Sequence, residues 1–411
     1  MNAARKRLYA VGLTVLLSSL ACVSVYGQTN PPGERFVFYL DSNSHLHELY
    51  AVASGSDWTD LDWETAGVPV AASGSALTSI VDNLGLVHVY YEGTSQQILE
   101  FYQLEGNAGG WSDRSPSSLA DAPAAVVGSA LTCLVDRSRG NNVIHVFYRG
   151  TNENVYELYT SNEGANWYSD DPTSLAGAPV AASGSALTSF IDLSNGNDFM
   201  HVFYLGTNDN VYELYWIGGG AWHSDDPTTL SGAPTPASTS SKITSFIDNT
   251  GGTASIMHVF YPGSNQNVYE MYYSGDWHSD DPTSLAGAPI AVSGSALTSF
   301  INISGSGDTG MHVMYLGANE NVYALHWVTD WSYFDATTVS DGVPATPGSA
   351  LTSFQDTVTG GVRLYFIGAN SHVYELYWPS EGAASETDLI AASGGTAAAS
   401  GSALTGVMQP N

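Results

Sequence analysis

The sequence is poor in positive charge. Its 411 residues include 10 Lys and Arg against 40 Asp and Glu, which gives a formal net charge of -30. Proteins bind nucleic-acid phosphates and anionic lipid headgroups through clustered Lys and Arg. The composition therefore argues against nucleic acid as a partner and against attachment to an acidic membrane surface.

Long apolar runs are also scarce, and the one present lies near the N-terminus, over residues 8–25. Three basic residues precede it at positions 5–7, and Val25 and Gly27 stand where small residues precede a cleavage site. This pattern predicts a signal peptide over residues 1–27 and a mature chain that is secreted or periplasmic. A membrane-spanning interpretation is weaker, because the run is short and polar sequence follows it. No membrane insertion is expected.

The chain has only two cysteines, Cys22 and Cys133. Cleavage of the signal peptide would leave Cys133 alone, and an exported protein with one thiol cannot be held together by internal disulfides. Packing and backbone ladders must therefore stabilise the fold, and Cys133 is interpreted as an inert buried thiol. A lipoprotein anchor through Cys22 is the weaker alternative for the N-terminus, because Ser19 is a poor first residue for that signal.

Aromatic residues and glycine are plentiful by contrast. The chain contains 24 Tyr, 13 Phe, 10 Trp and 43 Gly, and 43% of its residues are hydrophobic. This is enough apolar material for a real core, so the composition excludes a disordered chain. An acidic chain rich in aromatics, Gly, Ser and Thr is typical of all-β proteins.

One unit is repeated seven times along the chain. HVFYLGTNDNVYELYW at residues 201–216 has six related copies, and SALTSF, beginning at residue 185, has six more. The units are centred on Glu48, Glu100, Glu157, Glu213, Glu270, Ala324 and Glu375, which follow one another at intervals of 51 to 57 residues. This period fits a blade of four strands, because the units lack the 3.6-residue apolar stripe of a helix.

Each unit can be divided into four strands. The first is SALTSFID, the second is HVFYLG, and a Gly-Thr-Asn-x-Asn turn leads to the third, VYELYW. The fourth strand surrounds a tryptophan that the seventh unit lacks; these residues are Trp58, Trp111, Trp167, Trp222, Trp277 and Trp331. The segment that follows, such as SDDPTSLAGAPVAASG, contains Pro and Gly and is expected to be an irregular loop.

The order of strands predicts how the fold closes. The repeats begin on a second-strand sequence and finish on a first-strand sequence at residues 402–407. That last strand can complete the first blade and so remove the open edges of the sheet. We therefore expect residues 28–411 to form one all-β domain, a seven-bladed β-propeller of four-stranded antiparallel blades.

The polar residues that stand out recur with the repeat. A His or Arg at the head of the second strand precedes a Glu on the third strand by twelve residues. The complete pairs are His88/Glu100, His145/Glu157, His201/Glu213, His258/Glu270 and Arg363/Glu375. The sixth unit has His312 but Ala324, and the first has Glu48 but Phe36. An even separation across an odd hairpin loop, such as GTNDN, places both side chains on one face of the blade.

Such a pair beside an aromatic ring suits a sugar. The carboxylate accepts hydrogen bonds from hydroxyls, the basic group donates them, and the apolar face of the sugar can stack on Trp or Tyr. The alternative is that each pair only satisfies itself between two blades, as buried polar groups commonly do. Arg363 in place of His favours binding, because the two residue types share donor capacity but not shape.

The units resemble those of the fucose-binding β-propeller lectins, that is, the fungal fucose-specific lectin family and its bacterial seven-bladed relatives. The shared features are HVFY or RLYF, the GTNxN hairpin, VYEL, the Trp strand and the DPTSLAGAP loop, which together cover nearly all of residues 34–407. The resemblance implies sugar sites between adjacent blades, with aromatic stacking residues at Trp111, Trp167, Trp222 and Trp277 beside the five complete pairs. The six-bladed fungal members use Arg where most units here have His, and only Arg363 keeps it.

These observations predict a non-catalytic, multivalent lectin for fucose or a related deoxy or methylated sugar, with glycans as its partners and no metal or organic cofactor. Whether two rings pair into a homodimer is left open. A structural or protein-interaction propeller is the alternative. A glycosidase ranks third: residues 160–167 resemble a sialidase Asp-box once, but no unique pair of carboxylates stands out. The SDDP segments fit either calcium ligands or, more simply, Asp-capped turns.

Overall fold

The computed structural model describes residues 33–409, apart from residues 53–56, 105–109, 138–141, 162–165, 194–198, 251–254, 303–309 and 381. The predicted signal peptide, Cys22 and half of the Asp-box-like segment lie outside the described residues. No helix within the described part of the chain is long and apolar enough to cross a membrane.

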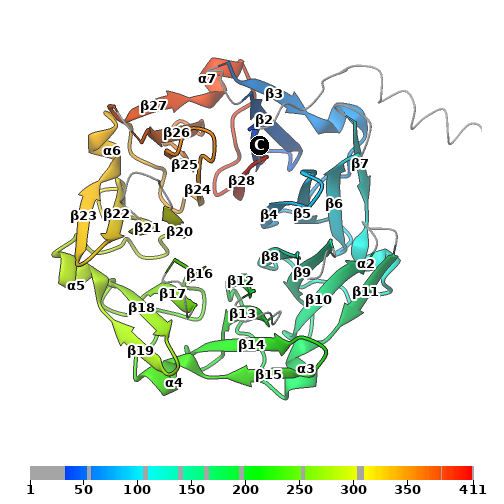
Figure 1. Cartoon of the computed structure of the whole chain (residues 1–411). Coiled ribbons are helices and arrows are strands. Elements are labelled where there is room, and N and C mark those ends of the chain that lie inside the picture. Colours follow the sequence, from blue (N-terminus) through cyan, green and yellow to red (C-terminus); the bar gives the residue numbers. More distant parts are fainter. Residues whose placement is uncertain are drawn as a thin grey trace, which may run out of the picture.

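Seven four-stranded antiparallel sheets surround a common centre as the blades of one ring (Figure 1). The innermost strands are β28 (Leu404–Met408), β4 (Leu77–Val81), β8 (Leu131–Asp136), β12 (Leu187–Asp192), β16 (Thr244–Asp248), β20 (Leu297–Asn302) and β24 (Leu351–Gln355). The second strands are β1 (Arg35–Leu40), β5 (Val87–Glu92), β9 (Val143–Arg149), β13 (Phe199–Leu205), β17 (Ile256–Pro262), β21 (Gly310–Leu316) and β25 (Val362–Ile367).

The third and fourth strands complete the blades toward the outside of the ring. The third strands are β2 (Leu46–Ala51), β6 (Ile98–Gln103), β10 (Val155–Ser161), β14 (Val211–Ile217), β18 (Val268–Tyr273), β22 (Val322–Trp327) and β26 (Val373–Trp378). The outer strands are β3 (Thr59–Asp62), β7 (Trp111–Arg114), β11 (Asn166–Asp170), β15 (Trp222–Asp225), β19 (Trp277–Asp280), β23 (Trp331–Asp335) and β27 (Ser385–Asp388). The predicted seven-bladed propeller is thereby confirmed.

The C-terminal strand closes the ring as expected. Blade 1 has the order β28-β1-β2-β3, so it joins the two ends of the repeat array, and blades 2 to 7 follow in sequence. β28 runs antiparallel to β1, with Phe36 opposite Val407. The hydroxyls of Ser79 on β4 and Thr405 on β28 are 2.7 Å apart, which ties the closing strand to blade 2 as well.

The second strands alternate between the two cores that flank each blade. On β13, Val202 and Tyr204 pack in the cluster shared with blade 3, while Phe203 and Leu205 pack in the cluster shared with blade 5. All four side chains are fully buried. Because successive side chains of a strand point to opposite faces, a strand covered on both sides must be apolar at nearly every position. This is the physical reason for the HVFY and RLYF segments.

The innermost strands carry a belt of side-chain hydroxyl contacts between neighbouring blades. The oxygens of Thr188 and Ser245 are 2.9 Å apart, and the same Thr–Ser contact joins the next blades along the ring. The belt explains the Leu-Thr-Ser core of the SALTSF repeat. Cys133 takes the place of Ser in the contact with Thr78, at 3.3 Å, and burial raises the pKa of its thiol to about 12. This agrees with an inert thiol.

The segments after the outer strands are not wholly irregular, contrary to expectation. Each contains a short helix: η1 (Trp63–Ala66), α2 (Pro116–Leu119), α3 (Pro172–Ala176), α4 (Pro227–Ser231), α5 (Pro282–Ala286), α6 (Ala336–Val339) and α7 (Leu389–Ser393). In α3, Asp171 accepts a hydrogen bond from the Ser174 amide, Pro172 occupies the first turn and Gly177 ends the helix in the left-handed conformation. Asp before Pro starts a helix, and Gly stops it.

The SDDP and Asn-x-Asn motifs serve one structural purpose. The side-chain amide of Asn154 in the hairpin of blade 3 donates to Asp171 at 2.8 Å, and Asn210 and Asn267 bind Asp226 and Asp281 in the same way. The second carboxylate oxygen thus holds the hairpin while the first caps the helix. The interpretation of these aspartates as caps is confirmed, and their oxygens are used within the fold.

Candidate functional site

The basic and acidic residues of each pair lie on the same face of their blade. In blade 4, Leu205 pairs with Val211 across a five-residue hairpin loop, and His201 stands opposite Tyr215. Glu213 precedes Tyr215 by two residues and therefore points to the same side as His201. The prediction from the even separation and the odd loop is confirmed.

All five complete pairs are in direct contact. The distances between Nδ1 and Oε1 are 2.7 Å in His88/Glu100, 2.5 Å in His145/Glu157, 2.5 Å in His201/Glu213 and 2.6 Å in His258/Glu270. Nη1 of Arg363 donates to Oε1 of Glu375 at 2.7 Å. Every one of these side chains is at least nine-tenths buried. The pairs are therefore well-formed polar contacts within a largely apolar setting.

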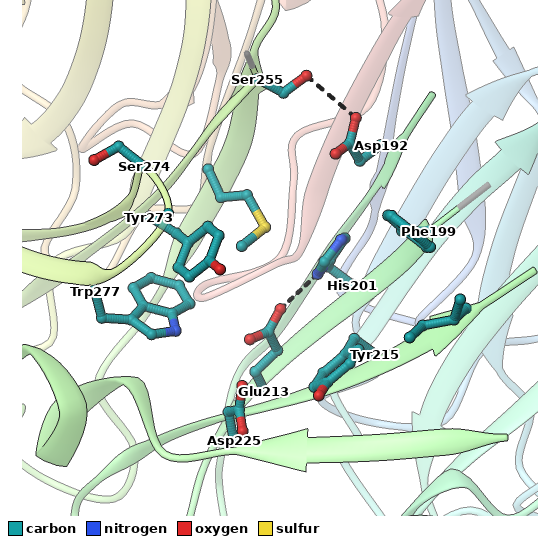
Figure 2. A pocket seen from close by; sticks show the side chains of 13 residues that line it. Asp192, Phe199, His201, Glu213, Tyr215, Asp225, Ser255, Tyr273, Ser274 and Trp277 are labelled. Carbon is teal, nitrogen blue, oxygen red and sulfur yellow. Dashed lines mark hydrogen bonds and ion pairs between the residues drawn. The ribbon is translucent and has the colours of Figure 1, made fainter. Parts of the chain in front are cut away.

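One pair lines a pocket of about 450 Å³ between blades 4 and 5. Figure 2 shows its two walls. Blade 4 contributes a polar wall that includes His201, Glu213 and Asp225, whereas the wall from blade 5 includes the aromatic rings of Tyr273 and Trp277. A carboxylate, an imidazole and aromatic rings around one small cavity are the groups that a sugar needs for its hydroxyls and its apolar face.

The tryptophan of each site comes from the following blade and not from its own unit. Each ring packs edge-on against the second strand of the preceding blade, at interplanar angles of 74° to 84°. The contacts are Tyr90–Trp167, Phe147–Trp222, Phe203–Trp277, Phe260–Trp331 and Tyr365–Trp58. Because neighbouring blades lie face to face, an outer strand meets the pair of the blade before it.

This arrangement corrects the set of tryptophans chosen from the sequence. Trp167, Trp222 and Trp277 lie beside complete pairs, but Trp111 packs against Phe36 and Phe38 in blade 1, whose unit has no basic partner. The sequence-based choice missed Trp331 and Trp58, which lie beside His258/Glu270 and Arg363/Glu375. The predicted ring could have indicated them. In a closed ring the outer strand of each blade packs against the preceding blade, so its tryptophan lies beside the pair of the preceding unit. The binding role of all these residues stays a prediction.

Charge is distributed differently among the pairs. Burial by itself would lower the pKa of His88, but hydrogen bonds to Asp82 and Glu100 outweigh it and raise the pKa. Burial would likewise raise the pKa of Glu100, but hydrogen bonds from His88 and Arg114 lower it. Asp82, His88, Glu100 and Arg114 therefore form one network of charged groups that is largely buried. At Glu270, by contrast, burial raises the pKa by more than the contact with His258 lowers it.

The two incomplete units have lost the pair in different ways. In blade 1, Nε1 of Trp63 donates to Glu48 at 2.9 Å, and burial raises the pKa of this carboxyl to about 8. In blade 6, His312 stacks on His326 with 4.5 Å between ring centres, and burial lowers the pKa of His312 to about 3. Neither arrangement offers an ionised carboxylate beside a basic donor.

One cluster away from these pairs could hold a metal ion. Ligand atoms of His45, Asp62 and Glu64 lie within 4.8 Å of one another at the edge of blade 1. Asp62, however, already caps η1 by accepting from the Glu64 amide at 2.9 Å. His45 occupies the hairpin position at which other blades bind the capping aspartate, as His372 does with Asp388 at 2.7 Å. The cluster is accounted for by the fold.

Comparison with known proteins supports the resemblance drawn from the repeats. The family model described as fungal fucose-specific lectin matches residues 14–233, which is more than half of the chain. No curated protein matches it in sequence. Among solved structures, AofleA from Arthrobotrys oligospora has a TM-score of 0.54 at 16% identity, over 82% of this chain and 90% of that one.

A second solved structure is that of the Aleuria aurantia lectin, a six-bladed propeller, in a mutant form bound to alpha-methyl-L-fucoside. Its TM-score is 0.51 at 16% identity, and the match covers 77% of this chain and 95% of that chain. At this identity the likeness concerns the fold alone. The present ring differs from it by one additional blade.

Proposed function

Because the chain belongs to the fungal fucose-specific lectin family, we propose that it binds fucose or a related deoxy or methylated sugar in the grooves between its blades. The observation that carries the proposal is the pocket between blades 4 and 5, where His201 and Glu213 face Trp277. Lectins bind carbohydrate without converting it, and the chain is accordingly not an enzyme. The glycosidase alternative is abandoned on this ground.

The walls of the pocket suit the two sides of a deoxy sugar. Glu213 has one hydrogen-bond partner among the described residues, His201, so its carboxylate retains acceptor capacity for sugar hydroxyls. Trp277 and Tyr273 offer rings for the apolar face of the sugar. Met257 is part of the same lining and provides an apolar surface for a methyl group. Similar groups recur around the ring, so weak sites on one rigid body would gain avidity toward clustered glycans.

A structural or protein-interaction propeller is the second candidate, and the burial of the pairs favours it. Glu157, Glu213 and Glu270 are each less than 4% exposed, as expected for polar groups that only satisfy their own histidines in the space between two blades. The two candidates differ in one measurable respect, because only the lectin loses a ligand when these carboxylates are removed.

We therefore expect the wild-type ring to bind methyl α-L-fucoside and the triple variant Glu157→Ala/Glu213→Ala/Glu270→Ala to bind it at least about 10-fold more weakly. Methyl α-L-galactoside is the matched sugar, because it carries a hydroxyl where the fucoside has a methyl hydrogen. It should bind more weakly than the fucoside, since the added hydroxyl meets an apolar wall. Calorimetric titration gives the affinities, and circular dichroism shows whether the variant remains folded.

A glycan array with the same two proteins extends the test to other sugars. If the wild-type ring binds no glycan at all, the lectin proposal is wrong and the structural propeller remains. If the folded triple variant binds as well as the wild type does, the sugar does not use these carboxylates.

The proposal includes export of the protein, because glycoconjugates of other cells are met outside the cytoplasm. The support is the basic and apolar pattern of residues 1–27. N-terminal sequencing of protein purified from its natural host should then find Gln28 first. A mature protein that still begins at Met1 would contradict the export proposal without affecting the sugar sites.

A further inference from the structure

The five complete pairs differ in the residue that faces the glutamate from the outer strand. In blades 3, 4 and 5 it is an aspartate, and the register pairs are Glu157–Asp170, Glu213–Asp225 and Glu270–Asp280. In blade 2, Glu100 instead stands opposite Arg114. In blade 7 the residue opposite Glu375 is Thr387, and a guanidinium reaches this site from blade 1. The outer-strand residue paired with the glutamate therefore distinguishes the sites of blades 3, 4 and 5, which have an aspartate, from those of blades 2 and 7, which do not.

The guanidinium of Arg114 lies in the space that corresponds to the pocket between blades 4 and 5. Its Nε donates to Glu100, and its central carbon lies 4.2 Å from the ring centre of Tyr102 and 5.5 Å from that of Trp167. By register, Tyr102 and Trp167 are the counterparts of Tyr215 and Trp277, which line the pocket. Between blades 2 and 3, both aromatic surfaces are therefore already in contact with a cation.

The site between blades 7 and 1 is filled in a related way. The guanidinium of Arg35 lies 5.0 Å from the ring centre of Trp58, and its Nη1 is 3.4 Å from Glu375. Arg363 lies 4.0 Å from the ring centre of Tyr377, the counterpart of Tyr215. Arg35 occupies the strand position that Met257 has in the wall of the open pocket. Guanidinium groups again cover the two rings that a sugar would use.

The glutamates of these two sites also have more partners within the protein. Tyr90 donates to Glu100 at 2.9 Å, in addition to His88 and Arg114. Likewise Tyr365 donates to Glu375 at 2.7 Å, in addition to Arg363 and Arg35. Blades 3, 4 and 5 have phenylalanine at this strand position, as at Phe203, and each glutamate there has one described partner, its histidine. A carboxylate with three protein partners has little capacity left for sugar hydroxyls.

We propose that the guanidinium groups of Arg114 and Arg35 close two of the five sites, so that three sites bind sugar: those between blades 3 and 4, 4 and 5, and 5 and 6. The inference rests on the proposed lectin function and concerns which grooves perform it. A groove is open where the glutamate's described side-chain partner is its histidine and no guanidinium, as in blades 3, 4 and 5. Where an aspartate faces the glutamate, no described guanidinium lies over the rings of the groove. Where Arg114 of the outer strand or Arg35 of the next blade pairs with the glutamate, its guanidinium covers a ring of that groove. In the closed sites the two guanidinium groups also join neighbouring blades, Arg114 through the ring of Trp167 and Arg35 through Glu375.

The test counts occupied grooves. Titration calorimetry and crystals soaked with methyl α-L-fucoside should show three sugars per wild-type ring. Arg114→Asp places in blade 2 the residue that the open blades carry, and it should add a fourth sugar between blades 2 and 3. Asp225→Arg is the converse change, and it should remove the sugar between blades 4 and 5 and leave two. Asp225→Asn adds no guanidinium and should keep three.

Each result bears on the proposal in a defined way. A wild-type ring with five sugars, or with a sugar between blades 2 and 3, overturns it while leaving the lectin function intact. An unchanged count in Asp225→Arg also overturns it. If Arg114→Asp fails to fold, Arg114→Ala and the Asp225→Arg count decide the question, because blade 2 shows that the fold accepts arginine at this position. Failure of the wild type to bind any sugar would instead contradict the proposed function itself.

Discussion

A chain that ends at residue 401 should lose its stable ring. It lacks β28, so blade 1 keeps three strands and the hydrogen-bonding edge of β1 is exposed. It also loses the contact of Thr405 with Ser79 and the buried contact of Gln409 with Gln103, both of which join blade 1 to blade 2. We expect the midpoint of thermal unfolding to fall by on the order of 10 °C or more, with aggregation through the open edge.

Thermal unfolding followed by circular dichroism, together with size-exclusion chromatography, measures this effect. A chain that ends at residue 409 keeps all of β28 and serves as the matched control, which should behave as the full chain does. A synthetic peptide of residues 402–411 should restore the unfolding midpoint of the truncated chain when it is added in excess, because the strand pairs non-covalently. Identical unfolding of the truncated and full-length chains would show that the ring does not depend on this strand.

The second large effect concerns the pH dependence of stability and Glu48. Burial, together with the nearby acids Glu34 and Asp60, raises the pKa of this carboxyl to about 8, although the hydrogen bond from Trp63 opposes the shift. In the unfolded chain the pKa returns to its ordinary value of 4.5. Between these two pH values the folded state binds more protons than the unfolded state does, so the free energy of unfolding falls as the pH rises.

Replacing Glu48 with Gln should remove most of this decrease in the free energy of unfolding between pH 4.5 and pH 8. The shift from 4.5 to about 8 corresponds to a ceiling of roughly 5 kcal/mol, and the variant should be more stable than the wild type at pH 8 by a substantial part of it. Near pH 4.5 the two proteins should be nearly equal in stability, because Glu48 is neutral in the folded state. The amide oxygen of Gln can still accept the hydrogen bond from Trp63.

Urea unfolding at pH 5 and pH 8 measures the free energy of unfolding of the wild type and of Glu48→Gln. Asp57→Asn is the matched control, because it removes an exposed carboxylate from the same blade and should leave the wild-type difference between the two pH values in place. Glu34, whose pKa burial raises to about 7, contributes a smaller total decrease in the same direction, because its pH window is narrower. If Glu48→Gln is no more stable than the wild type at pH 8, the buried carboxyl is not the source of the pH dependence.

The sequence predicted the strands well because the pattern of apolar and polar residues in each strand depends on which of its faces are buried. The second strands are apolar at nearly every position since both faces are covered, and the HVFY segments show this directly. The five-residue hairpin loop and the twelve-residue spacing placed His201 and Glu213 on one face without any tertiary information. The helices after the outer strands were missed, although their signals were present: Asp171 before Pro172, and Gly177 at the end.

At the candidate site, the sequence did not indicate which tryptophan lies beside which pair. Trp331 and Trp58 lie beside complete pairs, whereas Trp111 lies against the incomplete unit, because an outer strand packs on the preceding blade. The roles of Arg114 and Arg35 were also missed. Each is a single basic residue outside the repeated pattern, and nothing in its local sequence shows which aromatic ring its guanidinium meets.

The sequence by itself determined the number of blades, the strands within them, the closing strand and the pairing of basic and acidic residues. All of these depend on periods and spacings along the chain, since strand alternation and hairpin length are local properties of the backbone. The tertiary structure alone decided which tryptophan faces which pair and which grooves between blades are filled by guanidinium groups. Those contacts join different blades, and their geometry depends on how the faces of two sheets pack together.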